Sequence, residues 1–118
     1  MDATDPGGAR LAPGDRHRVV LVTVPSVADG ERIARALVEE RLAACVNVVP
    51  GLRSVYRWQG AVETADEALL LVKTREAALE RVAARVRALH PYTLPEIVAL
   101  PLVSGLAAYL EWIDDGVA

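Results

Sequence analysis

The stretch that decides the fold runs from residue 46 to residue 73 and reads VNVVPGLRSVYRWQGAVETADEALLLVK. Two extended arms rich in apolar and β-branched residues flank the pair Gln59-Gly60. A glycine at this place supplies the positive φ that a tight two-residue turn requires. We therefore predict one long β-hairpin, in which counting outward from the turn places Tyr56 opposite Glu63.

The first arm of the hairpin carries an interruption at Pro50-Gly51. Proline lacks the backbone N–H that a strand ladder uses, so this pair predicts a bulge or a bend. An uninterrupted count brings Lys73 near Val46, and the register beyond the bulge is left open.

Hydrophobic patterning predicts a strand and a helix before the hairpin and a helix after it. Residues 18–24 (RVVLVTV) form a β-branched strand, and the S-x-x-D spacing at Ser26 is typical of a helix start. After the hairpin, a helix capped by Thr74 repeats apolar residues at i, i+3, i+4 and i+7. This helix ends at His90-Pro91, because proline disfavours helical geometry in the residue before it.

The last predicted elements are a strand over residues 96–103 and a short helix that opens at Ser104-Gly105. The order β-α-β-β-α-β with an added C-terminal helix predicts an α+β fold with a ferredoxin-like antiparallel sheet. Pro101 is typical of a sheet edge. The two edge strands, residues 46–58 and 96–103, are apolar, so we expect them to pair with other subunits.

Composition and charge limit the domain organisation, the partners and the location. Residues 1–17 lack periodicity and predict a flexible tail with an incidental His17, whereas residues 18–118 form one domain. The net charge of −3 argues against a nucleic-acid partner. No membrane span or secretory signal is recognisable, and the single cysteine, Cys45, can form no intrachain disulfide. A cytoplasmic location is therefore expected.

A long ordered series of short motifs runs through residues 18–115. The motifs are Ala43-Ala44-Cys45-Val46-Asn47, Pro50-Gly51, Ser54-x-Tyr56-x-Trp58-x-Gly60, Glu67-x-Leu69, Lys73-Thr74, His90-Pro91-Tyr92-x-x-Pro95-Glu96-Ile97, Leu100-Pro101 and Tyr109-Leu110-x-Trp112. This series resembles the CutA divalent-ion tolerance family. The resemblance implies a homotrimer, similar in architecture to PII-type signalling trimers, whose long hairpins reach across to neighbouring subunits. It also implies a role in tolerance of divalent metals, especially copper, and animal relatives are linked to acetylcholinesterase anchoring or processing.

Three residues are candidate metal ligands: Cys45, His90 and Glu96. A thiolate suits copper, and an imidazole at an exposed helix end is a common ligand. In the alternative reading, Cys45 is a small buried hydrophobic residue. His90 is then a helix cap, because positive charge is favoured at a helix C-terminus. Some copper-binding relatives carry a cysteine where this chain has Val22 and a second histidine where it has Leu89. One chain offers no H-E-x-x-H, no C-x-x-C and no pair of histidines at metal spacing, so any strong site would be assembled between subunits.

A second set of residues could line a ligand cleft: Tyr56, Trp58, Lys73, Tyr92, Glu96 and Glu67. Aromatic faces with one cation and one carboxylate suit a small anionic or planar ligand. In the alternative, the aromatic residues pack across a trimer interface and Lys73 pairs with Glu67 or Glu96.

Catalytic templates are not matched by the chain. The sequence contains no G-x-S-x-G elbow and no G-x-x-x-x-G-K-S/T loop, so we expect neither an enzyme nor an organic cofactor. The leading hypothesis is a trimer that binds copper or another divalent cation weakly. The alternatives are a PII-like module that binds a small metabolite and a non-catalytic scaffold trimer.

Overall fold

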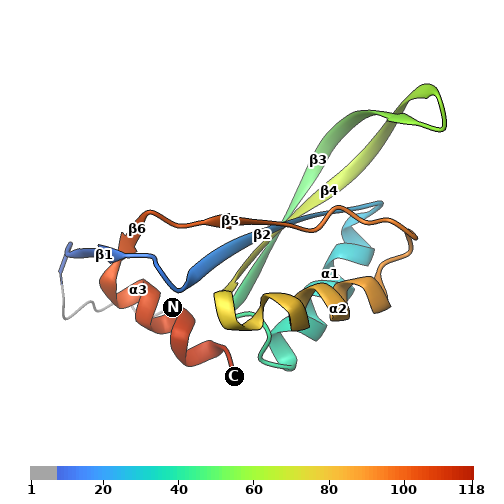
Figure 1. Ribbon diagram of the computed structural model, residues 1–118. Coiled ribbons are helices and arrows are strands. Elements are labelled where there is room, and N and C mark those ends of the chain that lie inside the picture. Colours follow the sequence, from blue (N-terminus) through green and yellow to red (C-terminus); the bar gives the residue numbers. More distant parts are fainter. Residues whose placement is uncertain (1–7) are drawn as a thin grey trace.

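A four-stranded antiparallel sheet with helices on one side organises the molecule (Figure 1). The computed structural model describes residues 8–118. In chain order the elements of this layer are β2 (His17–Val24), α1 (Val27–Glu39), β3 (Cys45–Trp58), β4 (Ala61–Arg75), a 3-10 turn (Glu76–Ala78), α2 (Leu79–Leu89) and β5 (Val98–Pro101). The strand order is β3-β4-β2-β5. This is the predicted ferredoxin-like arrangement, with β3 and β5 at the edges.

The tip of the β3–β4 hairpin is built as predicted. Gln59 and Gly60 both have positive φ, 50° and 83°, which is the geometry of a tight two-residue turn. Tyr56 pairs with Glu63. The hairpin extends well beyond the rest of the chain (Figure 1), so its tip has few contacts with the body.

The predicted bulge decides the register at the far end of the hairpin. The pairing shifts between Val49 and Leu52, where the proline-glycine pair lies. Beyond this shift, Lys73 pairs with Cys45 and not with Val46, as an uninterrupted count would have placed it. One extra residue in β3 therefore brings a lysine and the only cysteine of the chain side by side.

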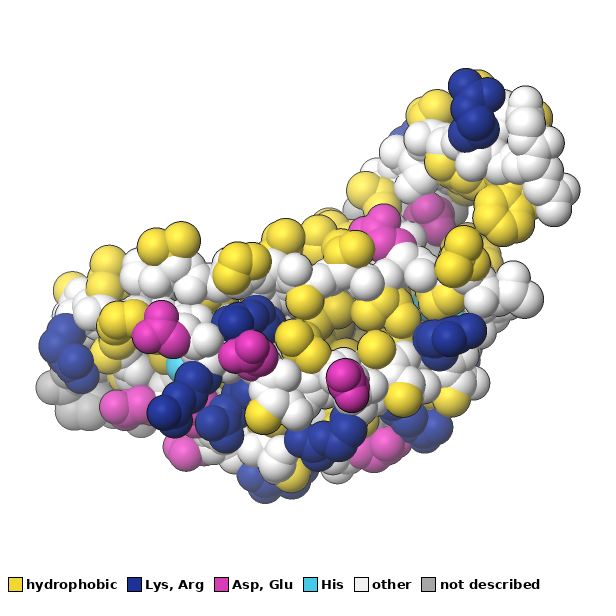
Figure 2. Space-filling model, viewed as in Figure 1, with side chains coloured by type: hydrophobic (Ala, Val, Ile, Leu, Met, Phe, Trp, Pro, Cys, Tyr) yellow, Lys and Arg dark blue, Asp and Glu magenta, His cyan; other side chains and the backbone are white. Residues whose placement is uncertain are grey.

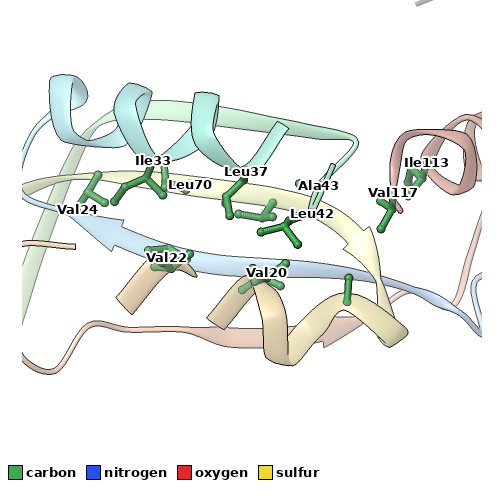
Figure 3. Close-up of a cluster of buried hydrophobic side chains, with 14 of the residues drawn as sticks. Val20, Val22, Val24, Ile33, Leu37, Leu42, Ala43, Leu70, Ile113 and Val117 are labelled. Carbon is green, nitrogen blue, oxygen red and sulfur yellow. The ribbon is translucent and has the colours of Figure 1, made fainter. Parts of the chain in front are cut away.

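The hydrophobic core lies between the sheet and the helices. Alternate residues of the central strands point to the helix side and are fully buried: Val20, Val22 and Val24 of β2, and Leu70 and Val72 of β4. Figure 3 shows the side chains of the three valines and of Leu70 in this core. They pack with Ile33 and Leu37 of α1 and with Val82 and Val86 of α2. The apolar face of each helix, which repeats every 3.6 residues, thus packs on the alternate residues that the strands present on one side of the sheet.

The other face of the sheet carries no helix from α1 or α2, and we call it the open face. Alternation places further apolar side chains there: Val19, Leu21, Leu69, Leu71, Val98 and Leu100. All four residues of β5 are exposed. Figure 2 shows hydrophobic side chains along the course of β5 and acidic side chains where the hairpin leaves the body.

Both ends of the chain differ from the prediction. Strand β1 (Leu11–Pro13) pairs with β6 (Ser104–Leu106), and α3 (Ala107–Gly116) follows β6 directly. A flexible tail through residue 17 is therefore wrong for residues 11–17, while residues 1–7 lie outside the described residues. His17 is buried, and its Nε2 lies 2.9 Å from Asp114 Oδ1. The helix predicted to open at Ser104-Gly105 begins three residues later, because those residues belong to a strand.

The two predicted helix caps have different outcomes. The Asp29 backbone N–H donates to Ser26 Oγ at 3.1 Å, so the cap of α1 is confirmed. Thr74 does not cap α2, because it belongs to β4 and its buried hydroxyl donates to the Leu42 carbonyl at 2.6 Å. The predicted end of α2 at His90 is confirmed.

Candidate functional site

The open face collects most of the residues that the sequence singled out. Strand alternation and the bulge place five of them on this face: Cys45, Tyr56, Trp58, Glu67 and Lys73. They form two groups, because Lys73 is six positions further along β4 than Glu67, a distance of about 20 Å along a strand. The predicted cleft residues are therefore only partly brought together.

The first group surrounds Cys45, at the end of β3 that lies farthest from the hairpin turn. The Lys73 ammonium donates to Cys45 Sγ at 3.6 Å and to the side-chain carbonyl of Asn47. The Tyr109 hydroxyl of α3 lies 4.0 Å from the same sulfur. Burial raises the pKa of Tyr109, and the neighbouring Cys45 adds to this effect. The contact with Tyr109 was missed from the sequence because it depends on where α3 packs.

The second group lines a cleft of about 600 Å³ where the hairpin leaves the body. Its lining residues come from β2, β3, β4 and the segment before β5: Thr23, Ser54, Val55, Tyr56, Trp58, Glu67, Tyr92, Thr93, Leu94 and Glu96. Five of the six predicted cleft residues are present. Lys73 is absent, because the register places it beside Cys45.

A hydrogen bond closes one wall of the cleft. The Tyr92 hydroxyl donates to Glu67 Oε2 at 3.0 Å and ties the segment after α2 to the hairpin. The pKa of Tyr92 is raised to about 12, mostly by burial and then by the hydrogen bond to the Glu67 carboxylate and by its charge. The carboxylate and the phenol therefore hold each other in place over the neutral pH range.

His90 lies behind this wall and is not the exposed helix-end residue that the sequence predicted. It is buried, and its Nε2 donates to the Thr23 carbonyl at 2.7 Å. Its Nδ1 accepts the Tyr92 backbone N–H at 3.0 Å. Both ring nitrogens are thus engaged, and His90 fixes the start of the segment that carries Tyr92.

The three predicted metal ligands are not assembled within one chain. Cys45 lies with Lys73 at one end of the open face, whereas Glu96 lines the cleft at the other. Within residues 8–118, no group of three or more His, Cys, Asp and Glu side chains is arranged to hold a metal ion. A complete metal site would need donors from a second copy.

The first prediction concerns the titration of Tyr92. Glu67→Gln removes the neighbouring charge, so we expect the pKa of Tyr92 to fall from about 12 toward its ordinary value of 10 while burial keeps it above that value. Because the folded-state pKa is raised, the stability that this phenol contributes is present below pH 10 and is lost as the pH rises to about 12. A pH titration of the tyrosine ring signals by NMR measures this shift.

The control for this titration is Asp66→Asn, which removes an exposed carboxylate from the opposite face of the same strand. It changes the net charge equally and is expected to leave the Tyr92 titration unmoved. An unchanged Tyr92 pKa in Glu67→Gln would contradict the hydrogen bond between these two side chains.

The fold and the site together define a small ferredoxin-like α+β protein with a protruding hairpin, an open apolar sheet face and a cleft at the hairpin base. Among residues 8–118, no helix has the length and apolar character needed to cross a membrane. The family model described as CutA1 divalent ion tolerance protein matches residues 18–116. The chain belongs to this family.

Individual relatives agree with this assignment. The divalent-cation tolerance protein CutA of Thermus thermophilus is 62% identical over 99 residues, which cover 84% of this chain and 96% of that protein. The chloroplastic CutA protein of Arabidopsis thaliana is 50% identical over 82% of this chain, which spans about half (53%) of that longer protein. A solved structure of the Thermus thermophilus protein superimposes with a TM-score of 0.85 at 58% identity, covering 86% of this chain and 99% of the other.

Proposed function

We propose that the protein is a non-enzymatic homotrimer that serves in divalent-cation tolerance and binds copper or another divalent cation weakly where subunits meet. The family supports the general role. The observation that carries the finer proposal is the open face, which combines exposed apolar surface with Cys45 at one end and the cleft that Glu96 lines at the other. Within residues 8–118 of one chain, the candidate donors are not brought together.

Association of copies is supported by the open face and the sheet edges. Val98 and Leu100 are each 46% exposed and continue the apolar row of Val19 and Leu21 on β2. The outer edges of β3 and β5 pair with no other strand among residues 8–118 and present backbone donors and acceptors. Burying this surface against further copies removes apolar area from water, at about 25 cal/mol per Å².

Weak binding follows from the state of the donors within one chain. A metal at His90 Nδ1 must displace the Tyr92 backbone N–H, which costs a hydrogen bond of about 1 kcal/mol. A metal at Cys45 must approach beside the Lys73 ammonium, whose charge repels it. Glu96 is exposed and free of such a penalty. We propose these three residues as donors that different subunits contribute.

The second prediction tests these donors by copper(II) titration calorimetry of the assembled protein. Cys45→Ser, His90→Gln and Glu96→Gln are each expected to weaken copper binding by roughly tenfold or more, because each removes a ligand. Glu111→Gln removes an exposed carboxylate from α3 and is the matched control. If all four variants bind copper like the unchanged protein, the proposed donors are wrong.

The cleft favours a second candidate function, which is a PII-like module that binds a small metabolite. Its volume of about 600 Å³ lies in the range of small-molecule sites. The two-residue turn of the hairpin argues against a close functional copy of PII-type proteins, which resemble this fold but use a long loop there. A scaffold trimer without any ligand is the third candidate.

We propose a cytoplasmic location, supported by the free thiol of Cys45.

A further inference from the structure

We propose that the cleft at the base of the hairpin binds a small organic cation, an ammonium ion that carries an aromatic or alkyl body. This inference goes beyond the proposed metal function and does not rest on it. It rests on the charges, the aromatic rings and the rigidity of the cleft wall.

The charges that line the cleft indicate that its ligand is positively charged. Within the described part of the chain, the ten lining residues include two carboxylates, Glu67 and Glu96, and no Lys, Arg or His. Strand alternation adds Glu63, opposite Tyr56, to the same face of the hairpin. The lysine that was expected to attract an anion lies beside Cys45 instead. An anionic ligand would therefore meet only negative charge.

The basic residues of the hairpin lie on its other face. Arg53 and Arg57 alternate along β3 with Ser54, Tyr56 and Trp58 of the cleft, and Arg53 pairs with Asp66 at 2.8 Å. The cleft face of the hairpin thus carries the carboxylates Glu63 and Glu67 and no basic residue, whereas the other face carries both guanidinium groups together with Asp66. Such a division strengthens the negative potential inside the cleft relative to the surrounding surface.

Aromatic rings supply the second element of cation recognition. Tyr56, Trp58 and Tyr92 line the cleft and are 43%, 46% and 38% exposed in the single chain, so none of the three rings is buried within its own subunit. The face of an aromatic ring attracts an ammonium ion, and Trp is the most effective of the three types. Leu94, which is 73% exposed, offers apolar contact for the body of the ligand.

One wall of the cleft is held before any ligand arrives. The Tyr92 hydroxyl donates to Glu67, and the Tyr92 backbone N–H donates to the buried His90. The His90 and Tyr92 rings also contact each other, with centroids 4.8 Å apart. A preorganised wall reduces the entropy that binding loses, which favours a specific ligand.

The same features fit an organic cation better than a bare metal ion. A hard divalent cation takes about six oxygen ligands, and this cleft offers two carboxylates, one of which already accepts the Tyr92 hydroxyl. Aromatic faces do not replace the missing oxygens. An ammonium ion needs only one carboxylate and the ring faces, which are what the cleft provides.

The test is titration calorimetry of the full-length assembled protein with benzyltrimethylammonium and, separately, with phenylacetate. Both probes carry one benzene ring, and they differ in the sign of their charge. We expect the cation to bind and the anion to show no measurable binding. Trp58→Leu and Glu67→Gln are each expected to weaken the cation roughly fivefold or more, because each removes one recognition element.

Two matched controls keep the test specific. Val62→Ala and Asp66→Asn change an exposed apolar residue and a carboxylate on the opposite face of the hairpin, and both should bind the cation as the unchanged protein does. Absence of cation binding, equal binding of phenylacetate, or unaltered binding by Trp58→Leu would each overturn the proposal. Copper titration of the unchanged protein under the same conditions separates this failure from a failure of the metal function.

Discussion

Leu100→Lys is expected to convert the proposed trimer into single chains. Leu100 is on β5, in the apolar row of the open face, and 46% of its surface is exposed in the isolated chain. If the open face is buried between subunits, an unpaired ammonium there costs several kcal/mol per subunit. Native mass spectrometry and light scattering measure the change in mass directly.

Val38→Lys provides the matched control. Val38 is on α1, is 41% exposed and differs from Leu100 mainly in facing away from the open face. We expect this variant to remain a trimer. If Leu100→Lys also remains a trimer, or if Val38→Lys dissociates, the proposed subunit contact is on the wrong surface.

Leu70→Ala is expected to lower the free energy of unfolding by about 2–5 kcal/mol, because it leaves a cavity in a close-packed core. Leu70 is fully buried on the helix side of β4, and its Cδ2 lies close to the backbone of Gly30 on α1. Chemical denaturation at a fixed protein concentration measures the loss, since the proposed subunit association would also contribute to stability.

The control for the core is Leu11→Ala, which removes the same atoms from a leucine that is 64% exposed in β1. We expect its effect to stay within about 0.5 kcal/mol, the usual range for a surface substitution. Similar losses in the two variants would contradict the placement of the core between the sheet and the helices.

Local signals explain why the sequence predicted most of the sheet. The glycine of the hairpin turn, the proline-glycine bulge, the Ser26 cap and the His90-Pro91 stop each act within a few residues. Hydrophobic periodicity then fixed which faces meet, and the chain connections fixed the strand order. These features need no knowledge of distant contacts.

Contacts between distant segments account for what was missed. The β1–β6 ladder joins residues 11–13 to residues 104–106, and neither segment is long enough to predict a strand alone. The same neighbourhood buries His17 against Asp114, 97 positions further along the chain. Thr74 looked like a cap because its buried partner, the Leu42 carbonyl, is equally remote in sequence.

The sequence predicted most of the residues of the candidate site, but it did not predict which of them lie together. Residue type and family resemblance singled out the aromatic and acidic residues that do line the cleft. Lys73 lies six positions along β4 from Glu67 and is therefore kept apart from them. The burial of His90 could not be read from its helix-end position, because the carbonyl of Thr23 that it contacts belongs to β2.

The most direct test of a metal site shared between subunits is native mass spectrometry with one equivalent of copper(II) per chain. The unchanged protein and Leu100→Lys are compared at the same concentration. We predict a trimer that carries specifically bound copper and a Leu100→Lys monomer that carries none. Copper bound equally to the monomer, or a trimer without any specific copper adduct, would contradict a site completed between copies.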